Sequence, residues 1–221
     1  MKVVLISGLK KEFDKKLAVV FVREGYKVFA ISDERLDIAN EGIALLPVDL
    51  KDAAEKIKKD RGLVDLYIDV SDERSLLDNF DVRTGINDQV IRDLYEANVI
   101  RPMAMLEAFM PLLEAGQGKR LCFLTSAEAS INETRGADGL GYKMAKAGLH
   151  NFLQITRNVL APRDFTIRVY DPMHSEAEPS AAAEAAFNYF TRGRGVERND
   201  PLRDDECNLV FRDAYGRQHA W

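Results

Sequence analysis

Short apolar runs rich in β-branched residues alternate with longer segments of helical periodicity along the whole chain, and this alternation most constrains the fold. The apolar runs lie at 3–6, 27–31, 43–48, 65–70, 121–124, 165–170 and 208–211. The helical segments lie at 13–23, 53–59, 89–113, 142–160 and 181–190, with a bend expected at Pro102 in the third. Strands that alternate with helices through short connections predict a doubly wound parallel α/β sheet with helices on both faces. Residues 1–221 are therefore expected to form a single domain.

The charge balance argues against a nucleic-acid or membrane partner. The 31 basic and 36 acidic side chains leave a net charge of −5, and no basic patch is visible. The first apolar run is too short for a signal peptide or a membrane span. Cys122 and Cys207 lie in apolar runs and are expected to be buried thiols of a cytoplasmic protein. The three histidines lack metal-ligand spacing, so no metal site is expected, and the charged stretch 192–206 is expected to be a solvated loop.

The pair Tyr142 and Lys146 is the strongest chemical signal in the sequence. The two residues are four positions apart at the start of a predicted helix, so they share one helix face. A tyrosine hydroxyl has a pKa near ~10 and is a poor acid–base group at neutral pH. A nearby ammonium and the helix N-terminus would both favour the phenolate and lower that pKa. We therefore expect Tyr142 to exchange a proton with a carbonyl or alcohol oxygen, although a surface tyrosine beside a solvated lysine has the same pattern.

Two further residues place this pair in a recognisable context. Ser126 ends the fifth apolar run, one connection before the Tyr142 helix, and Asn98 lies in the preceding long helical segment. Together with the alternating pattern, these four residues resemble the catalytic tetrad of the short-chain dehydrogenase/reductase superfamily. Segment 121–155 resembles that family's strand, serine, loop and Tyr-x-x-x-Lys helix, and the chain's ending resembles the C-factor-like subgroup. The resemblance covers essentially the whole chain and implies a Rossmann-like fold.

The resemblance also implies a role for each of the four residues. Tyr142 would be the proton donor or acceptor, and Ser126 would polarise the substrate oxygen. Lys146 would hold the cofactor ribose hydroxyls and lower the pKa of Tyr142, while Asn98 would support a water relay to Lys146. Thr125 or Ser130 would replace Ser126 if the loop is offset.

The first turn departs from the family's glycine-rich pattern, Thr-Gly-x-x-x-Gly-x-Gly. Only Gly8 remains, and Glu12 and Asp14 stand where the other two glycines would allow the pyrophosphate to approach the backbone. Acidic residues in a first helical turn commonly satisfy free N–H groups, and we favour that interpretation of both over a direct role. Lys10 and Lys11 would offset part of the repulsion on the pyrophosphate, or would simply be solvated.

The other cofactor elements implied by the resemblance are partly altered. After the fourth run the chain reads Asp-Val-Ser-Asp, with Val70 as the candidate contact, in place of the family's Asn-Asn-Ala-Gly; after the sixth run only Pro172 is kept. Asp49 and Leu50 resemble the adenine contact. Asp33 offers an acid for a ribose hydroxyl and Arg35 a cation for a 2′-phosphate, so NADP and NAD both remain open as the cofactor. His174 lies near the expected substrate entrance.

Two main hypotheses follow, and a third remains open. The first is an oxidoreductase of class EC 1.1.1.- that transfers a hydride between NAD(P)(H) and a small carbonyl or secondary alcohol. The second is a binding or regulatory protein on the same scaffold that has lost nicotinamide binding. The third is a lyase or isomerase that uses the Tyr–Lys pair without net hydride transfer. Segments 89–113 and 142–160 resemble the helices that pair in the family's dimers, so a homodimer or homotetramer is expected.

Overall fold

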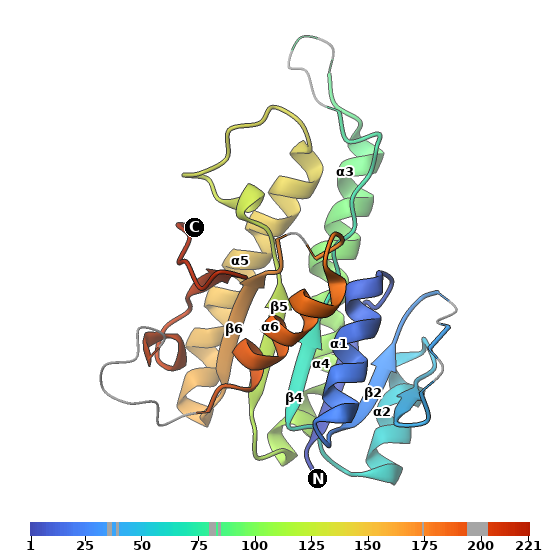
Figure 1. The fold of residues 1–221 in the computed structure, drawn as a ribbon. Coiled ribbons are helices and arrows are strands. Elements are labelled where there is room, and N and C mark those ends of the chain that lie inside the picture. The colour runs from blue at the N-terminus through green and yellow to red at the C-terminus, as the bar shows by residue number, and fades with distance from the viewer. Residues whose placement is uncertain (35–36, 39, 80–82, 84, 174, 194–202) are drawn as a thin grey trace.

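The computed structural model describes residues 1–34, 37–38, 40–79, 83, 85–173, 175–193 and 203–221. Seven parallel strands form one sheet in the order β3-β2-β1-β4-β5-β6-β7 (Figure 1). The strands are β1 (Val3–Ser7), β2 (Lys27–Ile31), β3 (Ile43–Leu45), β4 (Leu66–Asp69), β5 (Arg120–Leu124), β6 (Thr166–Asp171) and β7 (Phe211–Asp213). The helices are α1 (Glu12–Arg23), α2 (Leu50–Asp60), α3 (Asp88–Tyr95), α4 (Arg101–Ala115), α5 (Leu140–Leu160) and α6 (Pro179–Thr191). The predicted doubly wound parallel sheet is confirmed.

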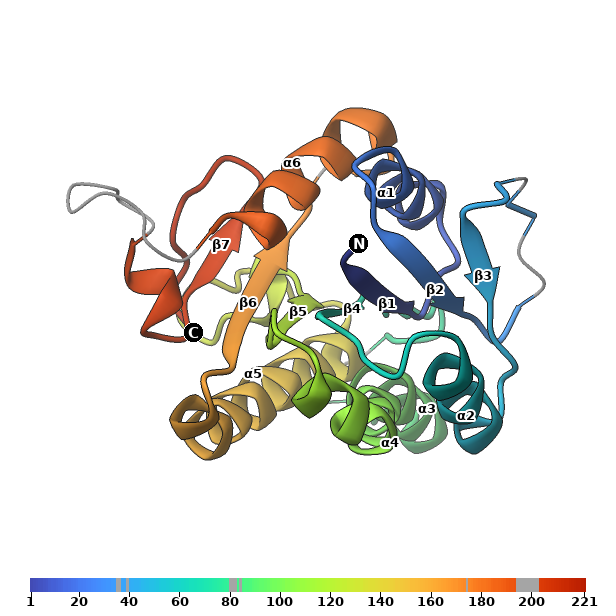
Figure 2. The same cartoon turned by 90° about the horizontal axis from the view of Figure 1, so that it is seen from below.

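The helices cover both faces of the sheet. Figure 2 shows α1 and α6 on one face and α2, α3, α4 and α5 on the other, in agreement with the packing of α1 on α6 and of α3 on α5. Alternate residues of each central strand enter different hydrophobic cores: Val3 and Leu5 face one, while Val4 and Ile6 face the other. Burial on both faces explains why these strands read as continuous apolar runs.

The long helical segment is continuous, but its irregularity lies before Pro102. A π-helical turn, Glu96–Ile100, joins α3 to α4. Pro102 has no N–H to donate to the carbonyl of Asn98, so the usual bonding pattern cannot continue through this turn. Asn98 itself lies in the π-helical turn and is fully buried.

Three predictions about the C-terminal region and the thiols need correction. β7 begins at Phe211, three residues later than expected, and continues to Asp213. Arg212 and Asp213 can enter the sheet because they are buried with charged partners. Residues 194–202 lie outside the described part of the chain. In the acidic run that follows, Asp205 and Glu206 are not solvated, since their side chains are 1% and 12% exposed. Cys122 is buried as predicted, but Cys207 is exposed. Among the described residues, no helix is long and apolar enough to cross a membrane.

Candidate active site

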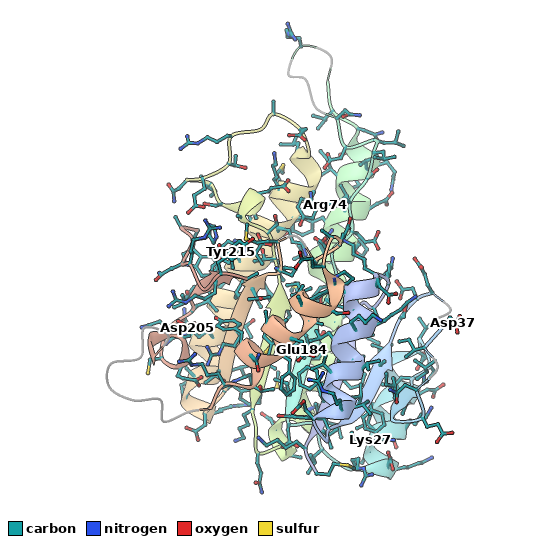
Figure 3. The ribbon with its side chains drawn as sticks, in the orientation of Figure 1. Lys27, Asp37, Arg74, Glu184, Asp205 and Tyr215 are labelled. Carbon is teal, nitrogen blue, oxygen red and sulfur yellow. The ribbon has the colours of Figure 1, made fainter. Side chains whose placement is uncertain are left out.

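A cavity of about 610 Å³ lies beyond the carboxyl ends of the strands, where an open parallel sheet places its ligand site. Arg74, labelled in Figure 3, lines the cavity from the loop that follows β4. The other polar lining residues used below are Lys11, Asp14, Asp72, Thr125, Ser126, Glu128, Tyr142 and Asp171. Val70 and Pro172, two of the predicted cofactor contacts, also line the cavity.

Helix α5 brings Tyr142 to this cavity and places Lys146 behind it on the same helix face, as the spacing predicts. Tyr142 is 2% exposed, and its hydroxyl donates to Oδ1 of Asp72 at 2.6 Å. Lys146 is fully buried, and its Nζ donates to the carbonyl oxygens of Ser71 at 2.5 Å and Leu124 at 3.3 Å. Burial lowers the pKa of Lys146, because the charged form loses its hydration.

The pKa of Tyr142 differs from the expectation: it is raised well above its ordinary value rather than lowered. Burial contributes most, and the negative charge of Asp72 adds to it. The ammonium of Lys146 lies 3.8 Å from Oδ1 of Asp72 and so is largely neutralised by that carboxylate. The N-terminus of α5 is also neutralised, because buried Asp78 accepts from the N–H groups of Gly141 and Tyr142 at 2.8 and 2.9 Å.

Asp72 is the functional residue that the sequence analysis missed. Besides the Tyr142 hydroxyl, its carboxylate accepts from Nζ of Lys11 at 2.6 Å. Although burial opposes ionisation, Lys146 and Lys11 hold the pKa of Asp72 well below its usual range. The available signal was its place just after β4, at the sheet edge where the site was expected, but the sequence did not indicate its partners.

Asn98 lies close to the site but serves the loop after β4. Its Nδ2 donates to the carbonyl oxygens of Glu73 and Leu94 at 3.0 Å each, and its Oδ1 accepts from the N–H of Glu73 at 3.1 Å. These contacts fix the backbone beside Asp72. The predicted relay through Asn98 remains a prediction.

Ser126, at the end of β5, lines the cavity, as do Thr125 and Ser175. Its Oγ accepts from the N–H of Glu128 at 3.2 Å, and a side-chain hydrogen bond with Tyr142 opposes the rise in the pKa of that tyrosine, although burial and Asp72 outweigh it. The hydroxyls of the two alternatives have other partners. Thr125 Oγ1 lies 2.5 Å from Nε2 of His150, and Ser130 Oγ accepts from the N–H of Glu133 at 3.1 Å.

The first turn, between β1 and α1, already holds a carboxylate. Asp14 is 2% exposed, and its Oδ2 accepts from the N–H groups of Lys10 and Lys11 at 2.8 and 2.7 Å. The interpretation that Asp14 satisfies free N–H groups is therefore confirmed. Burial raises the pKa of Asp14 to about 6. Glu12 instead points outward and pairs with Lys16 at 3.3 Å.

Gly8 is required in this turn by both conformation and space. Its φ of +81° lies in the left-handed region, and a Cβ there would lie 2.4 Å from Oγ of Ser71. The side chain of Lys10 pairs with Glu73, and that of Lys11 pairs with Asp72. Both predicted phosphate-neutralising lysines are thus engaged by carboxylates rather than solvated.

The remaining predicted cofactor residues lie apart from the main cavity. Asp33 pairs with Arg101 and borders a second pocket of about 310 Å³, which Lys10 and Arg74 also line. Asp49 caps α2 by accepting from the N–H of Asp52 at 3.0 Å, and the partly buried Leu50 packs against the core. Arg35 and His174 lie outside the described residues. Within the described ranges, no group of three or more His, Cys, Asp or Glu side chains gathers as metal ligands.

No family model matches the chain, and no curated protein matches it. Solved structures do. The chain matches a carbonyl reductase from Pseudomonas aeruginosa PAO1 in complex with NADP over 100% of both chains, with a TM-score of 0.78 and 21% identity. It matches the carbonyl reductase Sniffer of D. melanogaster over 100% of both chains, with a TM-score of 0.78 and 16% identity. A short-chain dehydrogenase/reductase from Burkholderia multivorans with bound NADP matches with a TM-score of 0.74 and 14% identity, over 100% of this chain and 99% of that one.

The chain therefore has the short-chain dehydrogenase/reductase fold over its whole length, as the resemblance implied. The likeness to the C-factor-like subgroup stays a prediction.

Proposed function

We propose that this chain is an oxidoreductase of the short-chain dehydrogenase/reductase type, which transfers a hydride between NAD(P)(H) and a carbonyl compound or secondary alcohol. The observation that carries the proposal is the convergence of Ser126, from the end of β5, and Tyr142, from α5, on one cavity with Lys146 buried behind them. The fold alone does not decide function, because unrelated activities share it.

The chain's own residues would bind and protonate the substrate oxygen. The Ser126 hydroxyl would donate a hydrogen bond to a carbonyl oxygen, and the Tyr142 hydroxyl would transfer its proton to that oxygen as the alcohol forms. Arg74 stabilises the negative charge that then develops on the phenol, because its guanidinium lies 3.9 Å from the centre of the Tyr142 ring. A nicotinamide cofactor would supply the hydride.

The catalytic end of the cavity fits the ribose of such a cofactor. Tyr142 lines this end of the cavity, and its hydroxyl is a hydrogen-bond donor that suits a ribose hydroxyl, while Lys146 lies fully buried behind it and donates to the carbonyls of Ser71 and Leu124. The phosphate end fits the cofactor only if Asp14 releases two hydrogen-bond donors. The N–H groups of Lys10 and Lys11, which would bind a phosphate, donate to Asp14, so these two hydrogen bonds must break first.

Replacing Asp14 by asparagine is expected to raise the affinity for NADH at pH 7.5 by about tenfold, or ~1.4 kcal/mol. Asparagine keeps an oxygen that can accept from the same N–H groups but removes the charge that repels a pyrophosphate. The pKa of Asp14 is raised, so its carboxylate is charged above about pH 6 and neutral below it. Wild-type affinity should therefore rise as the pH falls through 6. Calorimetric titration measures both effects.

The matched control is Glu12→Gln, which removes an acid of the same turn that points outward. NADH is the suitable probe, because the 2′-phosphate of NADPH titrates in the same pH range. If Asp14→Asn and the wild type bind NADH equally at pH 7.5, Asp14 does not limit cofactor binding.

A binding protein that no longer uses nicotinamide is the second candidate. The observation that favours it is that carboxylates hold both the first-turn N–H groups and the Tyr142 hydroxyl. The two candidates differ in one result: the oxidoreductase oxidises NAD(P)H in the presence of a carbonyl compound, and the binding protein does not.

We also propose a cytoplasmic homodimer or homotetramer. Met144, Ile155 and Val159 of α5 are 50–62% exposed and lie on one side of the helix, and Met103 of α4 is 38% exposed. We expect light scattering at micromolar concentration to give a multiple of the 24.9 kDa chain mass. The double substitution Met144→Asp and Ile155→Asp should lower the measured mass. A wild-type monomer would contradict the proposal.

A further inference from the structure

Asp72 occupies a position between the acid–base tyrosine and two lysines. Its Oδ1 accepts from the Tyr142 hydroxyl at 2.6 Å, and its Oδ2 accepts from Nζ of Lys11 at 2.6 Å. Nζ of Lys146 lies 3.8 Å from Oδ1. The loop that carries Asp72 is fixed next to it, since Asn98 binds both the N–H and the carbonyl of Glu73. The carboxylate is therefore held in place and is not a mobile surface group.

Charged groups from several parts of the chain surround Tyr142. Asp72 and Arg74 come from the loop after β4, and Lys146 comes from α5. Four other groups act indirectly. Lys11 pairs with Asp72, and Glu128 pairs with Arg74 at 3.1 Å. Asp78 accepts from the backbone of α5, and Asp171 lines the cavity. Of these groups, Asp72 alone accepts the hydroxyl proton of Tyr142 in a hydrogen bond.

This contact decides which protonation state of Tyr142 the site favours. A hydroxyl that donates to a carboxylate at 2.6 Å is stabilised as a charge-assisted hydrogen bond. A phenolate in the same place would face a second anion in a buried site, which is unfavourable. The raised pKa of Tyr142 agrees with this geometry.

We propose that Asp72 is a positioning residue that holds the Tyr142 hydroxyl as a hydrogen-bond donor and keeps the tyrosine a proton donor up to alkaline pH. The inference rests on the proposed function. As the substrate oxygen arrives, the hydroxyl turns from Asp72 to that oxygen. The Oη–H bond of Tyr142 breaks as the new O–H bond forms on the substrate oxygen; a bound NAD(P)H would supply the hydride to the carbonyl carbon and would itself be oxidised. The phenolate then recovers its proton from solvent.

The test is Asp72→Asn, which keeps the shape of the side chain and removes its charge. We expect the alkaline fall of kcat/KM for carbonyl reduction to move to lower pH by at least one unit, which is a tenfold change in the phenolate fraction. The ultraviolet absorbance of tyrosinate should show the same displacement for one tyrosine, identified by its loss in Tyr142→Phe. Glu73→Gln is the matched control: it removes the neighbouring acid, which pairs with Lys10 rather than with Tyr142.

The inference would be overturned if Asp72→Asn changed neither the pH at which kcat/KM falls nor the pH at which the tyrosinate absorbance of Tyr142 appears. The absorbance titration needs no turnover, so it decides the role of Asp72 even if the proposed activity fails. If Tyr142→Phe retains full activity, the proposed function fails instead. Asp72→Ala provides a second variant for both readouts if the asparagine variant does not fold.

Discussion

Tyr142→Phe is expected to lower kcat/KM for NADPH-dependent carbonyl reduction by about a thousandfold, or ~4 kcal/mol in the barrier. Phenylalanine keeps the ring beneath Arg74 but has no hydroxyl to transfer a proton to the substrate oxygen. Dinucleotide affinity should fall by no more than about tenfold, because one hydrogen bond to the ribose is lost while the phosphate end of the cavity is unchanged. Stopped-flow or steady-state assays, together with a binding titration, separate these two effects.

The matched control for this variant is Tyr215→Phe. Tyr215, labelled in Figure 3, is 69% exposed on the C-terminal segment and is not among the residues that line the cavity. Its rate should stay within twofold of wild type. Turnover that persists in Tyr142→Phe would show that another group protonates the substrate.

Asp205→Ala is expected to lower the free energy of unfolding by about 3–5 kcal/mol. Asp205 is 1% exposed and accepts from Arg212 at 2.9 Å, from Arg168 at 3.4 Å and from the Tyr189 hydroxyl at 2.9 Å. Its removal leaves two buried guanidinium groups short of a counter-charge. Arg168 keeps its pair with Glu206, but Glu206 also pairs with Arg120 at 2.8 Å and so can compensate only in part. Urea denaturation followed by circular dichroism measures the loss.

Glu184→Ala provides the comparison, and both residues are labelled in Figure 3. Glu184 pairs with Arg23 at 2.5 Å, but both side chains are largely exposed, so the loss of this pair should change the free energy of unfolding much less. Equal losses for the two variants would contradict the structural importance of the Asp205 cluster.

The fold could be predicted because its strands are buried on both faces. Continuous apolar runs of β-branched residues indicated the central strands, and β2 has the predicted bounds, Lys27–Ile31. The bounds of the two edge strands, β3 and β7, were predicted less well. β3 ends at Leu45, before Pro47, which cannot donate to a strand ladder. β7 spans Phe211–Asp213 rather than 208–211, and Arg212 and Asp213 can enter the sheet because they are buried with charged partners seven and four residues away, Asp205 and Arg217.

The site could be predicted where the contact is local in sequence. Tyr142 and Lys146 share a helix face at a spacing of four, and Asp14 binds N–H groups three and four residues before it. Asp72 could not be predicted, because its contact with Tyr142 spans 70 positions and depends on how the loop after β4 meets α5. The predicted lowering of the Tyr142 pKa was wrong for the same reason, since it considered Lys146 without Asp72.

Titration of the wild-type protein with NADPH and with NADH tests the proposed function most directly. We expect binding near 100 µM, on the order of −5.5 kcal/mol, for at least one cofactor at pH 7.5, and tighter binding by Asp14→Asn. The absence of binding at millimolar cofactor in both the wild type and Asp14→Asn would contradict a nicotinamide-dependent oxidoreductase and leave the binding protein as the better account.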